Sequence, residues 1–187
     1  MSATDLPWVI TDRLEAEEIP FMIVGAYATL AFGAYRTTDD LDVVLGLTPG
    51  DWERFTRAFP ETDFYRPPRE TFLEEAARNT RGHFNVIHLQ TMNRADCYLA
   101  GADPLQHWGL RTRRPIEMQE RRCWVAPPEL VILKKLEFFR EGESRKHVRD
   151  IEGIIRMVPD LDRAFIEQHV ERLGLREQWL ACQPGAT

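Results

Sequence analysis

Two aspartates on one predicted strand are the residues best suited to chemistry in this sequence. Asp40 and Asp42 are separated by one residue, and the apolar run 41–45 predicts a strand. Because side chains at positions i and i+2 of a strand point to the same face, the two carboxylates should lie side by side. Carboxylates this close repel each other unless a cation neutralises them, and such oxygen ligands suit Mg²⁺ or Mn²⁺. The pair therefore predicts a divalent-metal site.

A glycine turn lies shortly before this pair. The apolar run 20–24 predicts a short buried strand that ends at Gly25, and the segment after it predicts a compact helix with Ala26 in its first turn. The first N–H groups of a helix have no partner within the helix, so phosphate oxygens could bind there. A glycine before a helix is most often a plain turn, and Asp-x-Asp at a strand start is most often a solvated strand end. The two signals at this spacing are together more specific than either alone.

The segment Ile23 to Leu45 resembles the nucleotidyltransferase superfamily with the DNA polymerase β-like fold, in particular the bacterial toxin-type nucleotidyltransferases related to the AbiE toxin. The family pattern is an apolar strand, Gly followed by Gly or Ser, a short helix, and Arg-x-Thr-x-Asp-apolar-Asp. The matching residues here are Val24-Gly25-Ala26, then Arg36-Thr37-Thr38-Asp39-Asp40-Leu41-Asp42. Later matches are Asp96 within 94–98, Pro128-Glu129, Lys135-Leu136 and Lys146-His147-Val148-Arg149-Asp150-Ile151. The resemblance covers roughly Phe21 to Ile155 and departs from the pattern at Ala26, which replaces the second Gly or Ser.

The resemblance implies a role for each matched residue. The metal ligands would be Asp40, Asp42 and Asp96, with Asp96 near the acceptor hydroxyl as a base. The nucleotide would be bound by Gly25, Ala26, Arg36, Thr38 and Lys135, and Asp150 would orient a substrate group or Lys135. The plain structural alternatives are that Asp96 is an ordinary polar strand residue and that Lys135 and Asp150 form a surface ion pair, worth under about 1 kcal/mol.

The implied activity is metal-dependent transfer of a nucleoside monophosphate from an NTP to a hydroxyl, with pyrophosphate released. A tRNA 3′ end is the acceptor that the toxin-type relatives suggest, and an antitoxin protein would be a partner. Transfer to a small molecule, such as an aminoglycoside-type antibiotic, or to a protein is the alternative enzyme. A noncatalytic module that binds a nucleotide or a partner is the alternative from another class, although retention of both Asp40 and Asp42 argues against it.

Composition sets further limits on these hypotheses. The 187 residues include 24 Lys and Arg against 30 Asp and Glu, for a formal charge of −6, and 43% are hydrophobic, which excludes wholesale disorder. The acidic total argues against a general nucleic-acid coat, although the segments 111–122 and 134–149 each carry a local excess of positive charge. The three cysteines are far apart and predict buried thiols. With no apolar run near the roughly 20 residues of a membrane helix and no secretory pattern at the start, we expect a cytoplasmic protein without a membrane segment.

The elements that must position the site mix strands and helices early and are helical late. This order predicts an α+β fold in which a nucleotidyltransferase core over 1–126, a small mixed sheet flanked by helices, precedes a C-terminal helical extension over 127–187. The predicted strands are 20–24, 41–45, 84–89 and 95–99, the last two as a hairpin, with weaker edge strands at 115–118 and 123–125. The predicted helices are 6–19, 26–32, 51–59, 69–78, 104–110, 128–140, 144–157, 160–173 and a short piece around Trp179.

Overall fold

A seven-stranded mixed sheet is the centre of the computed structural model, which describes residues 6–33, 40–118 and 120–183. The strand order is β3-β4-β5-β2-β1-β7-β6. The strands are β1 (Phe21–Ile23), β2 (Asp40–Leu45), β3 (Phe64–Tyr65), β4 (His83–His88), β5 (Arg94–Leu99), β6 (Arg114–Met118) and β7 (Arg121–Val125). β2 pairs antiparallel with β1 and parallel with β5, so the predicted Asp strand lies in the middle of the sheet between two partners. The predicted α+β fold class is confirmed.

The predicted strands are present, but the edge of the sheet differs from the prediction. β4 and β5 form the predicted antiparallel hairpin. β7 was expected at the edge and instead pairs parallel with β1, through Ile23 and Val125, leaving β6 outermost. Pro115 has no N–H to donate to a neighbouring strand, so β6 is suited to the outermost position. β3 was missed because it has only two residues, of which Phe64 alone is buried.

The helices follow the predicted periodicity, with adjusted ends. They are α1 (Leu6–Ala16), α2 (Gly25–Ala31), α3 (Trp52–Ala58), α4 (Arg69–Ala76), α5 (Pro104–Thr112), α6 (Pro128–Gly142), α7 (Arg145–Met157), α8 (Arg163–Leu173) and α9 (Arg176–Leu180), with a 3₁₀ turn at Pro49–Asp51. α8 was expected from residue 160 but begins at Arg163, because the Asp162 carboxylate accepts a hydrogen bond from the Phe165 N–H and caps the helix.

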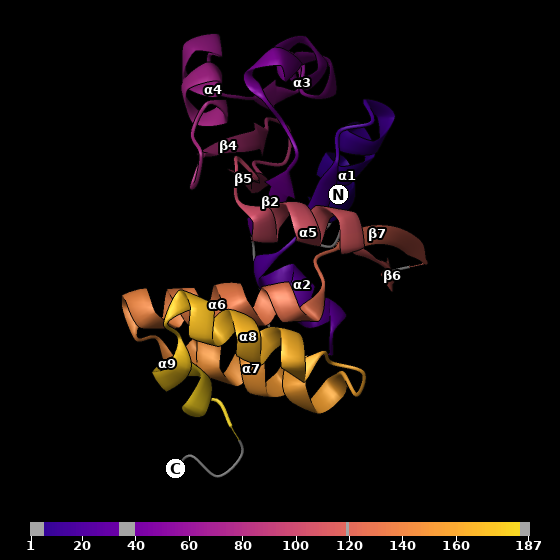
Figure 1. The fold of residues 1–187 in the computed structure, drawn as a ribbon. Coiled ribbons are helices and arrows are strands. Elements are labelled where there is room, and N and C mark those ends of the chain that lie inside the picture. Colours follow the sequence, from indigo (N-terminus) through magenta and orange to yellow (C-terminus); the bar gives the residue numbers. More distant parts are fainter. Residues whose placement is uncertain (1–5, 34–39, 119, 184–187) are drawn as a thin grey trace.

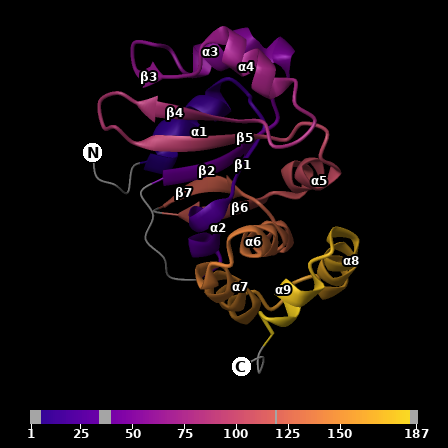
Figure 2. The same ribbon diagram turned by 90° about the vertical axis from the view of Figure 1, so that its left-hand side faces the viewer.

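The sheet separates two groups of helices (Figure 1). α3 and α4 lie beyond β4, where an aromatic cluster that includes Phe55, Phe72 and Phe84 fills the core. α6 lies at the other end, where it packs against α2 and carries α7, α8 and α9 around it. α5 flanks the sheet between these groups (Figure 2). Helix α7 is amphipathic: Val148, Ile151 and Ile154 are buried while most of its charged residues face outward.

The cysteines and the helix lengths bear on two further sequence predictions. Cys97, Cys123 and Cys182 are buried free thiols, as predicted. Burial raises the pKa of the Cys123 thiol to about 11 and that of Cys182 to about 12, which keeps both protonated at neutral pH. Among the described residues, none of the helices has the length and apolar character needed to cross a membrane.

Candidate active site

Three aspartates meet where β2 and β5 run side by side. The parallel register places Asp42 directly opposite Asp96 and Asp40 opposite Arg94. Asp96 is therefore brought to the predicted pair by strand pairing across the sheet, although it lies far away in the sequence. The side chain of Asp96 is 18% exposed and that of Asp40 is 45% exposed, so the group extends from the buried sheet to solvent.

The glycine turn lies against the same aspartates. Gly25 has a φ of +63°, the left-handed region that favours glycine, and begins α2. A Cβ added to Gly25 would lie 1.9 Å from Oδ2 of Asp42 and 2.7 Å from its Cβ. The Val24 N–H donates to the Asp42 carbonyl (2.9 Å), and the Ala26 N–H donates to the Asp42 carboxylate. The turn therefore holds Asp42 through its backbone, and only glycine fits at position 25.

Burial raises the pKa of the Asp42 carboxyl, and the negative charge of Asp96 raises it further. The Ala26 N–H, the Tyr98 hydroxyl and the charge of Lys135 act in the opposite direction. The Tyr98 hydroxyl donates to Oδ1 of Asp42 (3.4 Å), and burial raises the pKa of Tyr98, so this phenol stays protonated. Protein groups thus offset only part of the cost of burying a negative charge on Asp42. An added cation would stabilise the charged form.

Arg94 neutralises part of this negative charge. Its Nη2 donates to Oδ2 of Asp40 (2.8 Å) and lies 3.5 Å from Oδ2 of Asp96, while its Nε is 3.2 Å from Oδ1 of Asp96. Arg94 precedes Asp96 by two residues on β5, so both side chains share one face of the strand. The guanidinium therefore bridges the outer two carboxylates.

The chemistry of the three aspartates suits a divalent cation. Carboxylate oxygens from Asp40, Asp42 and Asp96 are the ligands that Mg²⁺ and Mn²⁺ prefer, and the mutual repulsion of Asp42 and Asp96 is relieved by a cation between them. In their present positions, no three His, Cys, Asp or Glu side chains of the described residues converge on a single point suited to a metal ion. Asp40 and Asp96 instead contact the Arg94 guanidinium.

Lys135 and Asp150 form an ion pair behind the aspartates. Lys135 Nζ lies 2.6 Å from Oδ2 of Asp150, and the two side chains are 5% and 9% exposed. The alternative of a surface ion pair is therefore wrong: α6 and α7 pack together and bury the pair. Lys135 is close enough to lower the pKa of Asp42, so its charge acts on the carboxylate site.

A cavity of about 370 Å³ joins most of the predicted residues. The predicted residues that line it are Gly25, Ala26, Asp40, Asp42, Asp96 and Lys135. Asp150 is not among the lining residues and pairs with Lys135. Arg36 and Thr38, which the sequence also assigned to nucleotide binding, lie outside the described residues.

Sequence reasoning missed several side chains of this cavity. They include Arg94 at its edge and the lining residues Tyr98, Gln106, Lys134 and Phe138. Lys146 and His147, which belong to the motif matched in the sequence, also line the cavity. Arg94 and Tyr98 lie two residues before and after Asp96, so the strand periodicity used for Asp40 and Asp42 could have found them. Gln106 of α5 and Lys134 and Phe138 of α6 had no such local signal.

Solved structures with this fold carry nucleotidyltransferase descriptions. No protein-family model and no curated protein sequence matches the chain. A crystal structure of ANT(2")-Ia in complex with adenylyl-2"-tobramycin matches with a TM-score of 0.64 and 15% identity, covering 96% of this chain and 99% of that one. An antigenic nucleotidyltransferase-like protein from Paracoccidioides brasiliensis matches with a TM-score of 0.57 and 18% identity, over 96% and 90% of the two chains.

A third solved structure is the lincosamide antibiotic adenylyltransferase LnuA bound to lincomycin. It matches with a TM-score of 0.52 and 9% identity, covering 82% of this chain and 97% of that one. At these identities the comparisons establish a shared fold, and the predicted nucleotidyltransferase-like architecture is thereby confirmed. The likeness to the AbiE toxin stays a sequence prediction.

Proposed function

We propose that this protein is a nucleotidyltransferase that moves a nucleoside monophosphate from an NTP to a hydroxyl. The observation that carries the proposal is the group Asp40, Asp42 and Asp96 on paired strands at a cavity, next to a glycine turn, within a fold shared with nucleotidyltransferases. A degenerate binding module would have no need to keep three carboxylates together at the expense of their repulsion.

The basic and the acidic side chains of the cavity would have different roles. Three lysines line the same cavity as the aspartates and would neutralise triphosphate oxygens, namely Lys134, Lys135 and Lys146. The Asp150 carboxylate holds Lys135 in place, so Asp150 is a positioning residue. Asp96 faces Asp42 and would lie near the acceptor hydroxyl, where a carboxylate can accept its proton.

A divalent cation fits this arrangement as a cofactor. Asp40, Asp42 and Asp96 would hold Mg²⁺ or Mn²⁺, which supplies neutralisation of charge on the triphosphate and on the attacking oxygen. Binding requires Arg94 to release at least one of its two carboxylate partners.

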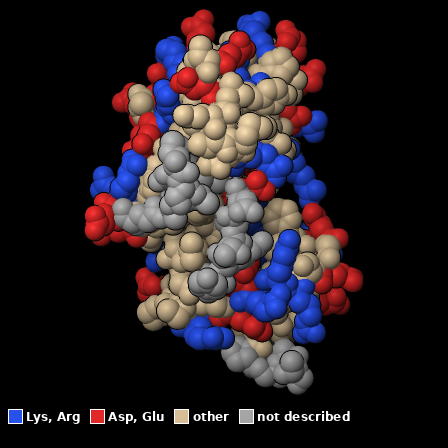
Figure 3. Space-filling view, turned by 180° about the vertical axis from the view of Figure 1, so that it is seen from behind, with Lys and Arg blue, Asp and Glu red and all other residues tan. Residues whose placement is uncertain are grey.

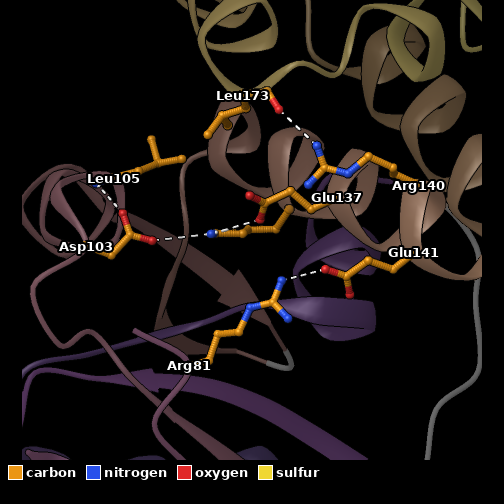
Figure 4. A network of polar contacts seen from close by, with 8 residues as sticks. Arg81, Asp103, Leu105, Glu137, Arg140, Glu141 and Leu173 are labelled. Atoms are coloured by element: carbon orange, nitrogen blue, oxygen red, sulfur yellow. Dashed lines mark hydrogen bonds and ion pairs between the residues drawn. The ribbon is translucent and has the colours of Figure 1, made fainter. Parts of the chain in front are cut away.

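We propose a small molecule with a hydroxyl as the first acceptor to test. A second cavity of about 380 Å³ adjoins the first and shares Tyr98, Gln106, Lys134 and Phe138 with it. Its rim carries carboxylates, drawn in Figure 4: Glu137 and Asp103 contact Lys134, and Glu141 pairs with Arg81. Two of the structural neighbours are described with tobramycin or lincomycin, which supports an acceptor of small size.

A tRNA 3′ end is the alternative acceptor. On the face drawn in Figure 3, Lys and Arg side chains lie over the C-terminal helices and are interspersed with Asp and Glu. Within the segment 111–122, Arg114 pairs with Glu129 and Asp160, and Arg121 pairs with Asp12, so part of the positive charge is already compensated. If RNA docks there, Arg→Ala changes at Arg113, Arg114 and Arg121 weaken RNA binding and flatten its salt dependence; unchanged binding at every salt concentration contradicts docking at this segment.

Transfer of label tests the proposal directly. The purified protein is incubated with each α-labelled NTP, Mg²⁺ or Mn²⁺, and in turn total tRNA, a panel of aminoglycosides and lincosamides, or protein alone. The Asp42→Asn variant is the control. We expect label on one acceptor class with the native protein and loss of at least about 100-fold with the variant, because the site loses a charged ligand.

Each outcome assigns a function. Label on a small molecule supports the proposed acceptor. Label on tRNA supports the toxin-type alternative, and label on protein keeps the chemistry and changes the acceptor. If no acceptor is labelled, NTP binding is measured with and without Mg²⁺. Absence of Mg²⁺-dependent binding as well would contradict the proposal and favour a noncatalytic module.

A further inference from the structure

A third cavity, which we call the basic cavity, lies on the other side of α5 from the candidate active site. It measures about 720 Å³ and shares no lining residue with the candidate active site. Its wall is formed where β2 and β5 end and β1 begins, together with one side of α5 and residues next to β6 and β7. Gln106 of α5 lines the candidate active site, whereas His107, Leu110 and Arg111 line the basic cavity. The two cavities are therefore distinct sites.

The charge of this cavity is opposite to that of the protein. Arg111, Arg113 and His107 line it, and no Asp or Glu does so within the described part of the chain. The sequence as a whole carries a net charge of −6. A cavity whose charged lining residues are both arginines attracts anions even in an acidic protein, because nearby charges of one sign focus the local potential.

The arginines of this region fall into two groups. Arg114 and Arg121 point to acidic partners on other elements, namely Glu129, Asp160 and Asp12. Arg111 and Arg113, which line the cavity, form no ion pair with any described residue. Arg122 is exposed outside the cavity, also forms no ion pair with a described residue, and lies over the Trp124 ring at 5.6 Å. The uncompensated charge is thus gathered at the cavity and beside it, and the ion pairs of Arg114 and Arg121 interrupt it elsewhere.

Arg113 is held in a fixed position. Its guanidinium stacks on the Trp124 ring at 4.9 Å from the centroid, and its Nη1 donates to the Leu110 carbonyl (2.6 Å). Its Nε is buried and has no hydrogen-bond partner among the described residues, so the guanidinium retains donor capacity. His107 is held as well, because its Nε2 lies 2.8 Å from the Gly101 carbonyl, an acceptor. Donors fixed in this way lose little freedom when they bind an anion.

We propose that this cavity binds a small organic phosphate. Arg111 and Arg113 would hold the phosphate oxygens, since guanidinium groups match them with two parallel hydrogen bonds. Leu47, Leu110 and Pro20 provide an apolar wall for the organic part. The volume lies within the range of small-molecule sites, and the interrupted charge favours a small ligand over an RNA strand, which needs a continuous basic surface. This inference does not depend on nucleotidyl transfer.

Calorimetric titration of the full chain with AMP, inorganic phosphate, adenosine and a short oligouridylate tests the proposal. EDTA is present, so that divalent-metal binding does not contribute. We expect AMP to bind, adenosine to bind far more weakly, and AMP affinity to fall about tenfold or more in Arg111→Gln/Arg113→Gln, as two charge-assisted contacts are lost. Arg172→Gln, the same change on an exposed arginine of α8 away from the cavity, should leave AMP affinity unchanged.

Two further readouts identify the site. The Trp124 indole resonance, assigned through Trp124→Phe, should shift with AMP. Arg113 also packs on Trp124, so its replacement could change stability as well as charge. The second variant is therefore Arg111→Glu alone, at an exposed position. It should reduce AMP affinity without changing the midpoint of unfolding. The proposal is overturned if AMP affinity falls in Lys146→Gln and not in the Arg111 and Arg113 variants, if adenosine binds as tightly as AMP, or if only the oligouridylate binds.

Discussion

Replacing Gly25 by Ala tests how the turn holds the candidate site. Gly25 has a φ of +63°, and an added Cβ would lie 1.9, 2.5 and 2.7 Å from Oδ2, Cγ and Cβ of Asp42. Rotating the Asp42 side chain can move its oxygens and Cγ but leaves its Cβ in place. The overlap is therefore relieved only if the backbone of α2 or β2 shifts.

The expected loss has two parts, which a matched variant separates. A left-handed backbone costs a non-glycine residue about 1–2 kcal/mol, and an overpacked contact costs roughly 1–3 kcal/mol more. Gly174 has nearly the same φ, +65°, but an added Cβ there meets nothing within 4 Å. Gly174→Ala should therefore lower the free energy of unfolding by the first part only, about 1–2 kcal/mol, and Gly25→Ala by about 2–5 kcal/mol.

Urea unfolding of the two variants and the native protein measures this difference. Label transfer by Gly25→Ala, at a temperature where the variant is folded, should fall at least about 100-fold, because a displacement near 1 Å is enough for such a loss. Gly174→Ala should retain native activity. If Gly25→Ala is no less stable than Gly174→Ala, or transfers label at the native rate, the turn does not hold Asp42 as argued.

Three further predictions concern the charges around the aspartates. Lys135→Met or Asp150→Asn alone should lower the free energy of unfolding by about 3–5 kcal/mol, since each leaves a buried charge unpaired, whereas Lys135→Met/Asp150→Leu should cost less than either in urea unfolding; additive losses would contradict a coupled pair. The pKa of Asp42 is raised above 3.8, so the native state holds this proton more tightly, and its contribution to stability is lost as pH rises through the folded pKa. In EDTA, Asp42→Asn should therefore gain stability over the native protein as pH rises through that window, and a variant less stable than native at neutral pH is the contrary result. Arg94→Gln removes the cation that bridges Asp40 and Asp96, so Mn²⁺ should bind more tightly in calorimetry; weaker binding would mean that Arg94 supports the metal site.

Local patterns were enough to predict several parts of the site. The strand of Asp40 and Asp42, the turn at Gly25 and the hairpin of β4 and β5 depend on the alternation of a strand and on residues that end elements. The helices after residue 127 depend on apolar periodicity and were found with end errors of a few residues.

Other features depended on contacts between distant segments. The interior position of β7 depends on its pairing with β1, which the short run 121–125 does not encode by itself. The same holds for Lys135 and Asp150: the sequence left open whether they serve the site or form a surface ion pair, and the packing of α6 on α7 buries them. Burial is a property of what an element packs against, so it cannot be obtained from the residues of one helix.

The sequence by itself determined that two carboxylates would share a face of one strand beside a glycine turn, because both features arise from backbone geometry over a few residues. Only the tertiary structure decided that Asp96 lies opposite Asp42, that Arg94 bridges Asp40 and Asp96, and that Arg111 and Arg113 line a separate cavity. Strand register and the partners of long charged side chains are set by contacts across the sheet and between layers, where residues distant in sequence compete for the same space and charge.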